Sequence, residues 1–321
     1  MRSWMGGVAG VVLCLCWTVQ PASGGLLYPG WVQRQLTNTP GWSENDPMFS
    51  PNGAEIVFTR SVSGANDIYK MASDGSGPQQ LLALDSTTPS YTRDGLHILY
   101  PQATGDPLGI WRMDTDGANK MLVAPVAGPV QMPNELPDGR IVFLRWVSPP
   151  MSVWIMNGDG SGQAQISVGA NMQQPRVSPD GRYVVYHSQA GDGTPYDIFR
   201  YDLILGTETQ LTFEAAQQGW PSFSPDGKWI VYQSKEDGGA NFDIWVMASA
   251  NPTVREQLND GALNSLFPQF RPDGSGIVFS YGGWGGGPTR DLFELQGAPE
   301  PASLLLLGGG IAALVRRRRR R

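Results

Sequence analysis

The sequence predicts an all-β fold: a six-bladed β-propeller of four-stranded blades, closed by an N-terminal strand that completes the last blade. Two observations predict it: a turn-and-strand motif occurs six times, and a second strand motif follows each copy. The turn glycines are spaced 42 to 47 residues apart, so the paired motifs mark one structural repeat. Four short strands in a unit of about 45 residues are typical of a propeller blade.

The first motif is a tight turn followed by a strand, as in "PSFSPDGKWIVYQS" at Pro221–Ser234. In Pro-Asp-Gly, proline presets φ at the first central position, aspartate accepts hydrogen bonds from its own backbone, and glycine takes positive φ. The β-branched and aromatic residues that follow favour a strand. The other copies begin at Pro47, Pro89, Pro133, Pro175 and Pro268, and the turn glycines are Gly53, Gly95, Gly139, Gly181, Gly227 and Gly274.

The remaining strands of each unit come from two further motifs. A "DIWVM"-type motif predicts the third strand, with copies that begin at Asp67, Gly109, Ser152, Asp197, Asp243 and Asp291. A "QLT"-like stretch, as at Gln210–Thr212, predicts the fourth strand of most units. The last unit stops at Leu295 without one, whereas "RQLT" at Arg34–Thr37 precedes the first unit. We expect this strand to complete the sixth blade and leave no open sheet edge.

Residues 1–24 have the features of a signal peptide. Arg2 gives the positive start, Met5–Trp17 the apolar stretch, and Ala22–Gly24 a cleavage site of small residues. Both cysteines, Cys14 and Cys16, lie inside this segment, and lipidation of one of them is the alternative interpretation. The predicted mature domain, residues 25–297, then contains no cysteine and depends on a hydrophobic core instead of disulfides.

The charge of the predicted mature domain argues against nucleic acid as a partner. Arg2, Arg316–Arg321 and Glu300 lie outside it, which leaves 16 of the 23 cationic and 28 of the 29 anionic side chains. The net charge of residues 25–297 is therefore near −12. A domain this acidic is a poor match for a phosphate backbone.

Few residues are candidates for catalysis or metal binding. His97 and His187 fall in strands of different blades, which favours structural histidines over a metal site. The Asp-Gly stretches, such as "SDGSG" at Ser73–Gly77, lack the ligand series of a calcium loop and are better explained as hairpin turns. We expect no catalytic residue, no metal and no cofactor.

A binding surface is expected on one rim of the propeller. In this fold the loops between the second and third strands and the connections between blades lie on one face, around the channel mouth. Aromatic and acidic side chains there could hold a peptide or a glycan, and ordinary solvated loops are the alternative. The tentative rim residues are Trp42, Asp46, Asp106, Trp146, Asp192, Glu236, Asp237 and Trp284.

The repeat resembles that of TolB-type propellers, with WD40-like or PD40 repeats, over about Gln35 to Leu295. The "SPDG" and "DIW-M" elements carry this resemblance, and they are specific for the repeat but not for a function. TolB itself has a further α/β domain before its propeller, for which this sequence leaves no room. The resemblance therefore implies the propeller fold and no Pal-binding role.

The last residues, 298–321, resemble the PEP-CTERM sorting signal of Gram-negative bacteria. They contain Pro299-Glu300-Pro301, the apolar segment Ala302–Val315 and an arginine cluster that starts at Arg316. The 14 apolar residues reach roughly 21 Å, against a hydrocarbon core of about 30 Å. The resemblance implies transient membrane insertion, with the arginines on the cytoplasmic side, and cleavage near Pro-Glu-Pro by an exosortase. A short tail anchor is the alternative.

Two functions are compatible with the sequence. The first is a non-enzymatic binding or scaffold protein, exported and displayed at the cell surface, outer membrane or extracellular matrix, whose ligand is an envelope or matrix protein or an exopolysaccharide. The second is an exported polysaccharide hydrolase or lyase with rim carboxylates such as Asp192 and Asp237 as acid and base. The full use of the repeats for blades and the missing catalytic set favour the first.

Overall fold

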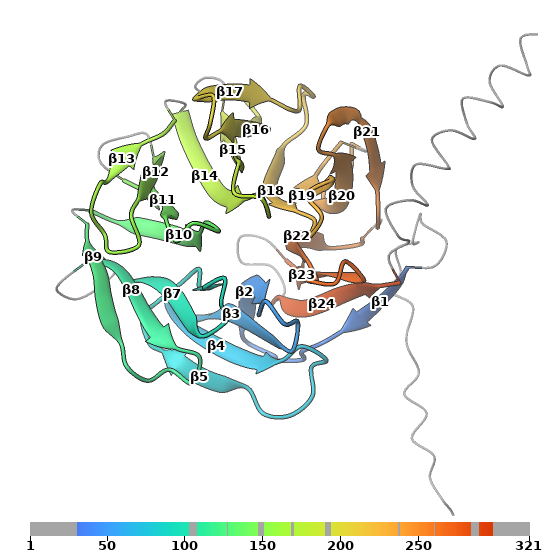
Figure 1. Cartoon of the computed structure of the whole chain (residues 1–321). Coiled ribbons are helices and arrows are strands. Elements are labelled where there is room, and N and C mark those ends of the chain that lie inside the picture. The colour runs from blue at the N-terminus through green and yellow to red at the C-terminus, as the bar shows by residue number, and fades with distance from the viewer. Residues whose placement is uncertain are drawn as a thin grey trace, which may run out of the picture.

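The computed structural model describes residues 31–102, 108–126, 128–146, 151–167, 170–189, 194–236, 238–259, 261–283 and 289–297. These residues form six antiparallel sheets of four strands, arranged as blades around a central channel (Figure 1). The all-β, six-bladed prediction is confirmed. No helix within the described ranges has the length and hydrophobicity needed to cross a bilayer.

Each of the first three blades is built from four consecutive strands. Blade 1 contains β2 (Ser43–Phe49), β3 (Glu55–Val62), β4 (Ala65–Ala72) and β5 (Gln80–Ala83). Blade 2 contains β6 (Ser90–Tyr91), β7 (His97–Gln102), β8 (Gly109–Asp114) and β9 (Met121–Pro125). Blade 3 contains β10 (Val130–Glu135), β11 (Ile141–Arg145), β12 (Ser152–Met156) and β13 (Ala164–Gln165).

Blades 4 and 5 repeat this order, and blade 6 combines the two ends of the domain. Blade 4 contains β14 (Ala170–Val177), β15 (Tyr183–Gln189), β16 (Tyr196–Asp202) and β17 (Thr207–Gln210). Blade 5 contains β18 (Gln218–Phe223), β19 (Trp229–Ser234), β20 (Asp243–Ala248) and β21 (Asn251–Gln257). Blade 6 contains β22 (Asn264–Phe270), β23 (Gly276–Gly282), β24 (Asp291–Gln296) and β1 (Val32–Gln35).

The N-terminal strand closes the ring, as the sequence predicts. β1 pairs with β24 in antiparallel register from Val32 opposite Gln296 to Gln35 opposite Phe293. β1 starts two residues before the predicted strand Arg34–Thr37 and ends at Gln35. The pairing with blade 6 extends one residue further, because the Leu36 backbone N–H donates to the Leu292 carbonyl at 2.8 Å.

One hydrogen bond joins the two strand motifs in blades 4, 5 and 6. The glutamine of the "QLT"-type stretch donates to the aspartate that begins the third strand of the same blade. Gln210 reaches Asp197 at 3.0 Å and Gln257 reaches Asp243 at 3.2 Å. Gln35 makes the same bond to Asp291 at 3.2 Å. β1 therefore reproduces the side-chain contact of a fourth strand as well as its pairing with the third strand.

The "SPDG" turn is held by its serine and aspartate. In blade 4 the Ser178 hydroxyl donates to Asp180 and accepts from the Tyr183 backbone N–H, both within 2.8 Å. The hydrogen bond from Ser178 is the main reason why the pKa of Asp180 lies below its usual value. All six turn glycines have φ between 70° and 83°, as the turn chemistry predicts.

The hydrophobic core is divided into six clusters, and each joins two neighbouring blades. Strands such as "IVF" are apolar on both faces because each face packs against a different neighbouring blade. The cluster between blades 6 and 1 includes Leu36, Phe49, Phe58 and Leu292, so the closing segment contributes to the core as well as to the sheet.

A bulge interrupts the innermost strand of the blades next to the channel. The residue before the first proline of each repeat takes a left-handed backbone conformation with φ between 45° and 59°, which is uncommon outside glycine. Strand register shifts at this point in five of the blades. These six residues, called the bulge residues below, are Asp46, Thr88, Met132, Gln174, Trp220 and Phe267.

Candidate functional site: the two mouths of the central channel

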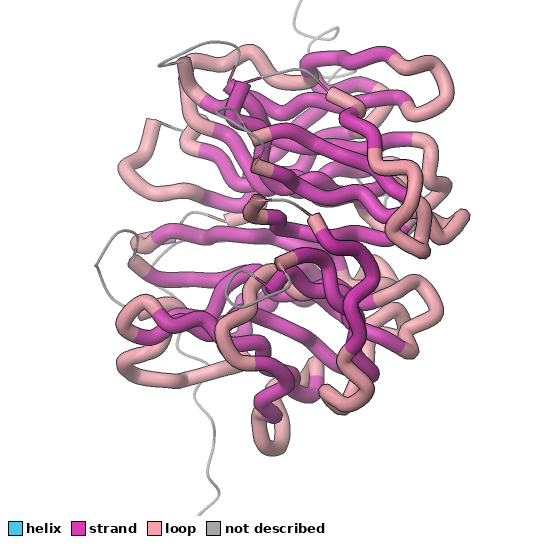
Figure 2. Tube along the Cα trace, turned by 90° about the vertical axis from the view of Figure 1, so that its left-hand side faces the viewer, coloured by secondary structure: helices cyan, strands magenta, loops and turns pink. Residues whose placement is uncertain are grey.

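The channel opens on two faces of different chemistry. We call the face with the connections between blades the upper face and the face with the "SPDG" turns the lower face. Viewed from the side, the strands run between the two faces and the loops lie at their ends (Figure 2). Because all six blades run in the same direction, equivalent residues of the innermost strands form rings at one depth of the channel.

The bulge residues form the ring at the upper mouth. All six line one cavity of about 440 Å³, together with Arg290 and several hydroxyl and amide side chains. The six backbone positions are equivalent, yet the side chains are an acid, a hydroxyl, a thioether, an amide, an indole and a phenyl ring. The repeat therefore fixes the backbone here and leaves the side chains free to form one asymmetric surface.

In four of the blades, a side chain of the preceding blade accepts a hydrogen bond from the backbone N–H of the bulge residue. The Thr59 hydroxyl accepts from the Thr88 N–H at 2.9 Å, and the Gln233 amide oxygen accepts from the Phe267 N–H at 3.1 Å. Since the bulge occurs in every blade, its unusual backbone is a property of the repeat and not evidence for one strained catalytic residue.

A polar contact crosses the channel within the ring of the upper mouth. The Gln174 side-chain amide donates to an Asp46 carboxylate oxygen at 3.3 Å, from blades that lie opposite each other in the ring (Figure 1). Burial raises the pKa of Asp46, and the positive charges of Arg176 and Arg290 oppose this shift. Burial also lowers the pKa of Arg176 to about 10, against the attraction of Asp46. The Asp46 carboxylate thus lies on the upper-mouth side of the channel and the Arg176 guanidinium on the lower-mouth side.

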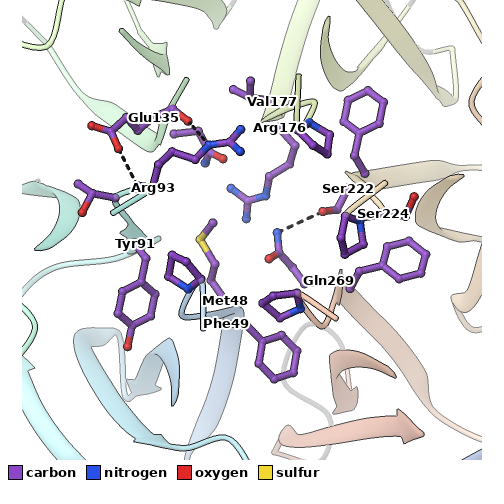
Figure 3. Close-up of a pocket in the computed structure, with 18 residues that line it drawn as sticks. Met48, Phe49, Tyr91, Arg93, Glu135, Arg176, Val177, Ser222, Ser224 and Gln269 are labelled. Atoms are coloured by element: carbon purple, nitrogen blue, oxygen red, sulfur yellow. Dashed lines mark hydrogen bonds between the residues drawn. The ribbon is translucent and has the colours of Figure 1, made fainter. Parts of the chain in front are cut away.

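The lower mouth is a smaller cavity of about 310 Å³ beneath this contact. Arg176 extends from β14 toward its centre, with Met48 and Gln269 on the opposite side (Figure 3). The Gln269 amide donates to the Ser222 hydroxyl at 3.3 Å, which fixes its orientation. Turn prolines line part of the rim, so this mouth is more uniform than the upper one.

Blade 2 departs from the turn motif at the lower mouth, where Arg93 stands in place of proline. Its backbone N–H donates to the Glu135 carboxylate at 2.6 Å, and its guanidinium donates to the Ser178 carbonyl at 3.2 Å (Figure 3). Arg93 therefore connects blade 2 to blades 3 and 4 around the mouth. We interpret Arg93 as structural, since its backbone N–H, Nε and Nη2 donate to protein acceptors.

His187 belongs to the bulge-supporting set. Its Nδ1 accepts a hydrogen bond from the Trp220 backbone N–H at 3.2 Å, the role that Thr59 and Gln233 have in other blades. The ring is almost fully buried, and burial lowers the pKa of His187 to about 3. His187 is therefore a neutral strand histidine at ordinary pH, which agrees with its structural interpretation.

The His187→Gln variant should be less sensitive to acid than the wild-type protein. A folded-state pKa of about 3, below the usual 6.5, means that the unfolded chain takes up a proton that the folded chain does not. The stabilisation from neutral His187 is complete above pH 6.5 and falls toward pH 3, by roughly 1.4 kcal/mol per pH unit. Glutamine supplies the same acceptor, as Gln233 does. Urea unfolding of both proteins at about pH 7 and about pH 4.5 measures the difference, and parallel losses would contradict it.

His97 lies on the lower side of blade 2, half-exposed, with Nε2 3.6 Å from an Asp114 carboxylate oxygen. Within the ranges that the structure describes, no three His, Cys, Asp or Glu side chains gather to hold a metal ion. The two histidines are thus placed in different blades and different environments, as their sequence positions indicate.

The described rim residues fall into different environments. The Arg60 guanidinium lies 5.5 Å from the Trp42 ring centroid, within the closing region, and Trp146 is exposed at the end of β11. Glu236 forms an ion pair with Arg255 at 3.1 Å and accepts a hydrogen bond from the Tyr232 hydroxyl at 3.1 Å. Of the four, only Asp46 lines the channel cavities described above.

Other predicted residues lie outside the described ranges. These are the rim residues Asp106, Asp192, Asp237 and Trp284, and the sorting residues Pro299, Glu300, Pro301 and Arg316. Their assignments stay predictions. Sequence reasoning did not single out the five bulge residues besides Asp46, or Arg176, although the residue before each repeat proline marks the bulge positions.

Comparison with known families agrees with this architecture. Two overlapping segments, residues 32–198 and 112–287, match the PD40 family, described as the TolB beta propeller domain. The chain belongs to this family. Residues 298–320 match the PEP-CTERM protein-sorting motif, which implies processing by an exosortase. Both resemblances noted from the sequence are thereby confirmed.

Individual relatives are more distant. An uncharacterised protein of Agrobacterium fabrum is 33% identical over 152 residues, which cover 46% of this chain and 52% of that protein. The chain thus spans about half the length of this relative. TolB from Acinetobacter baumannii is 19% identical, with a TM-score of 0.59 over 80% of this chain and 64% of that one. XC5397, a gluconolactonase from Xanthomonas campestris, is 14% identical, with a TM-score of 0.64 over 86% of this chain and 96% of that one. Likeness at this identity shows the fold alone.

Proposed function

We propose that this TolB-family propeller is exported to the cell surface or extracellular matrix and binds an envelope or matrix component there without catalysing a reaction. The observation that carries the proposal is the upper mouth, where six equivalent backbone positions present six different side chains around one cavity of about 440 Å³. Concave surfaces that mix aromatic and polar groups are typical ligand sites. The sorting motif supports delivery to the envelope.

Aromatic and charged groups at the upper mouth supply the means of binding. The Trp220 and Phe267 rings meet edge to face with centroids 5.2 Å apart, and the Arg290 guanidinium lies 5.9 Å from the Phe267 ring. Such rings bury a large apolar area at small conformational cost, and arginine beside them supplies charge and hydrogen bonds. A projecting group of a protein or glycan partner fits this combination.

The alternative, a polysaccharide hydrolase or lyase, needs two carboxyl groups about 5–9.5 Å apart on either side of a substrate. Among the described residues, Gln218 donates to both Glu214 and Glu236, and Arg255 pairs with both. This pair is therefore already bridged by protein groups, and Asp192 and Asp237, the carboxylates named from the sequence, lie outside the described residues. The gluconolactonase among the fold relatives is the reason to assay hydrolysis as well.

The proposal predicts that Phe267→Ala weakens binding to the partner by at least about tenfold, because a central aromatic side chain is truncated. The full chain, purified in detergent, would be titrated against immobilised envelope and matrix fractions of the native host. Arg93→Ala at the lower mouth is the matched control and should bind as the wild type does. Absence of saturable binding, or loss of binding with Arg93→Ala alone, would overturn the proposal.

A further inference from the structure

A second cavity of about 480 Å³ lies on the upper face between the ends of blades 4 and 5. Trp220 lines both this cavity and the upper mouth, so the two are neighbours separated by one indole ring. Tyr196 and Phe242 supply further aromatic walls, and Gln173, Gln217 and Asn264 supply amide groups. We call this cavity the blade 4–5 pocket. None of the rim residues that the structure describes, Trp42, Asp46, Trp146 and Glu236, lines it.

One buried donor in this pocket has no hydrogen-bond partner among the described residues. His187 lines the pocket and is 1% exposed. Its Nδ1 accepts from the Trp220 N–H, so the proton of the neutral ring must be on Nε2. Nε2 is buried and has no hydrogen-bond partner among the described residues. A buried N–H without an acceptor is unfavourable, so an acceptor brought by a ligand would be strongly preferred here.

One buried acceptor in the same pocket also lacks a hydrogen-bond partner within the part of the chain that the structure describes. Gln218 is 1% exposed, and its amide nitrogen donates to Glu214 at 3.2 Å and to Glu236 at 3.1 Å. Because carboxylates accept hydrogen bonds, this contact fixes which end of the amide is nitrogen. The Gln218 Oε1 atom is buried and has no donor among the described residues. The pocket therefore offers an unused acceptor as well as an unused donor.

We propose that the blade 4–5 pocket binds a glycosyl unit of a neutral saccharide, which rests on the proposed binding function and names its ligand class. A hydroxyl group donates and accepts at once, so the hydroxyls of a sugar satisfy both unused atoms. The amide groups offer further partners of both kinds, and the aromatic walls suit the apolar face of a sugar ring.

Charge selects a neutral glycan over an acidic one. Among the described residues, Lys235 is the one cationic side chain that lines the pocket, and its ammonium group donates to the Ala240 carbonyl at 2.7 Å. The carboxylates of Glu214 and Glu236 lie directly behind Gln218. With a net charge near −12 over residues 25–297, the domain repels a polyanionic chain. Both unused atoms are covered in this structure, so the proposal requires neighbouring side chains to change rotamer on binding, as is common at binding sites.

Calorimetric titration of the full chain in detergent with maltotriose, cellotriose, mannotriose and, for comparison, trigalacturonate tests the proposal. We expect at least one neutral trisaccharide to bind and trigalacturonate to bind more weakly. Gln218→Met, which removes the acceptor, and Tyr196→Ala, which removes an aromatic wall, should each weaken binding by about tenfold. Phe213→Ala, an exposed aromatic residue on the neighbouring connection, is the matched control and should change affinity less than twofold.

Thermal unfolding checks that each variant is folded. If Gln218→Met does not fold, the affinity of Tyr196→Ala decides whether the pocket binds the saccharide. No binding of any neutral trisaccharide, or equal binding by the pocket variants, would overturn the saccharide proposal. If the host fractions still bind and Phe267→Ala still weakens them, the proposed function stands and only the pocket assignment fails. If the trisaccharides and the host fractions both fail to bind, the two proposals fail together.

Discussion

Deletion of residues 1–37 should lower the free energy of unfolding by several kcal/mol relative to deletion of residues 1–30. The longer deletion removes β1 and its ladder with β24, and exposes that strand as an open edge. It also removes Leu36 from the core between blades 6 and 1 and Trp31 from the core between blades 5 and 6. The loss of buried apolar side chains and of a paired strand is among the most destabilising changes that a folded domain can undergo.

Urea unfolding of the two truncated proteins measures this difference. The shorter deletion is the matched control, because it leaves every described residue in place. Equal midpoints and slopes for the two proteins would show that the ring does not need its N-terminal strand. A lower slope for the longer deletion would show that the blades no longer unfold as one unit.

Arg60→Ala should destabilise the protein by about 3–5 kcal/mol, because it leaves a buried carboxylate without its cation. Glu44 is fully buried, and its Oε1 atom lies 2.5 Å from the Arg60 guanidinium. The Thr37 and Thr39 hydroxyls also donate to Glu44, so this ion pair fixes the closing segment to blade 1. The Arg60 guanidinium stacks on the Tyr69 ring at 4.3 Å, which adds packing to the charge.

Two further variants separate the charge effect from lost packing. Arg140→Ala removes an ion pair with Asp138 whose side chains are 40% and 53% exposed, and should change stability by less than about 1 kcal/mol. The double variant Glu44→Gln with Arg60→Met should lose less than Arg60→Ala alone, because no unpaired charge remains. An Arg60→Ala loss no larger than that of Arg140→Ala would show that Glu44 does not depend on its partner.

The sequence was sufficient for the blades and their closure because the signals are local and repeated. The turn residues, the β-branched strands and the Gln–Asp pairing of blades 4 and 5 lie within one unit, and Gln35 makes the same pairing where the two chain ends meet in blade 6. The bulges were not foreseen, since a residue before proline normally avoids the left-handed conformation. It is stabilised here by acceptors such as Thr59 and Gln233 of the preceding blade, which no local pattern reveals.

The sites depend still more on contacts between blades. Asp46 and Gln174 meet across the channel although 128 positions separate them in the chain. The blade 4–5 pocket joins side chains of blades 4, 5 and 6, from Gln173 to Asn264. The unused acceptor of Gln218 can be recognised only because its amide nitrogen is already bonded to Glu214 and Glu236. Residue spacing in the sequence cannot predict such contacts.

Site-specific photo-crosslinking tests most directly whether the upper mouth is the binding surface. A benzophenone amino acid would replace Phe267 at the upper mouth or, in a second protein, Pro225 at the lower mouth, each in the full chain within its native host. We predict that light couples an envelope or matrix component to position 267 and not to position 225. A crosslink at position 225 alone, or at neither position, would contradict the proposal that this propeller binds through its upper mouth.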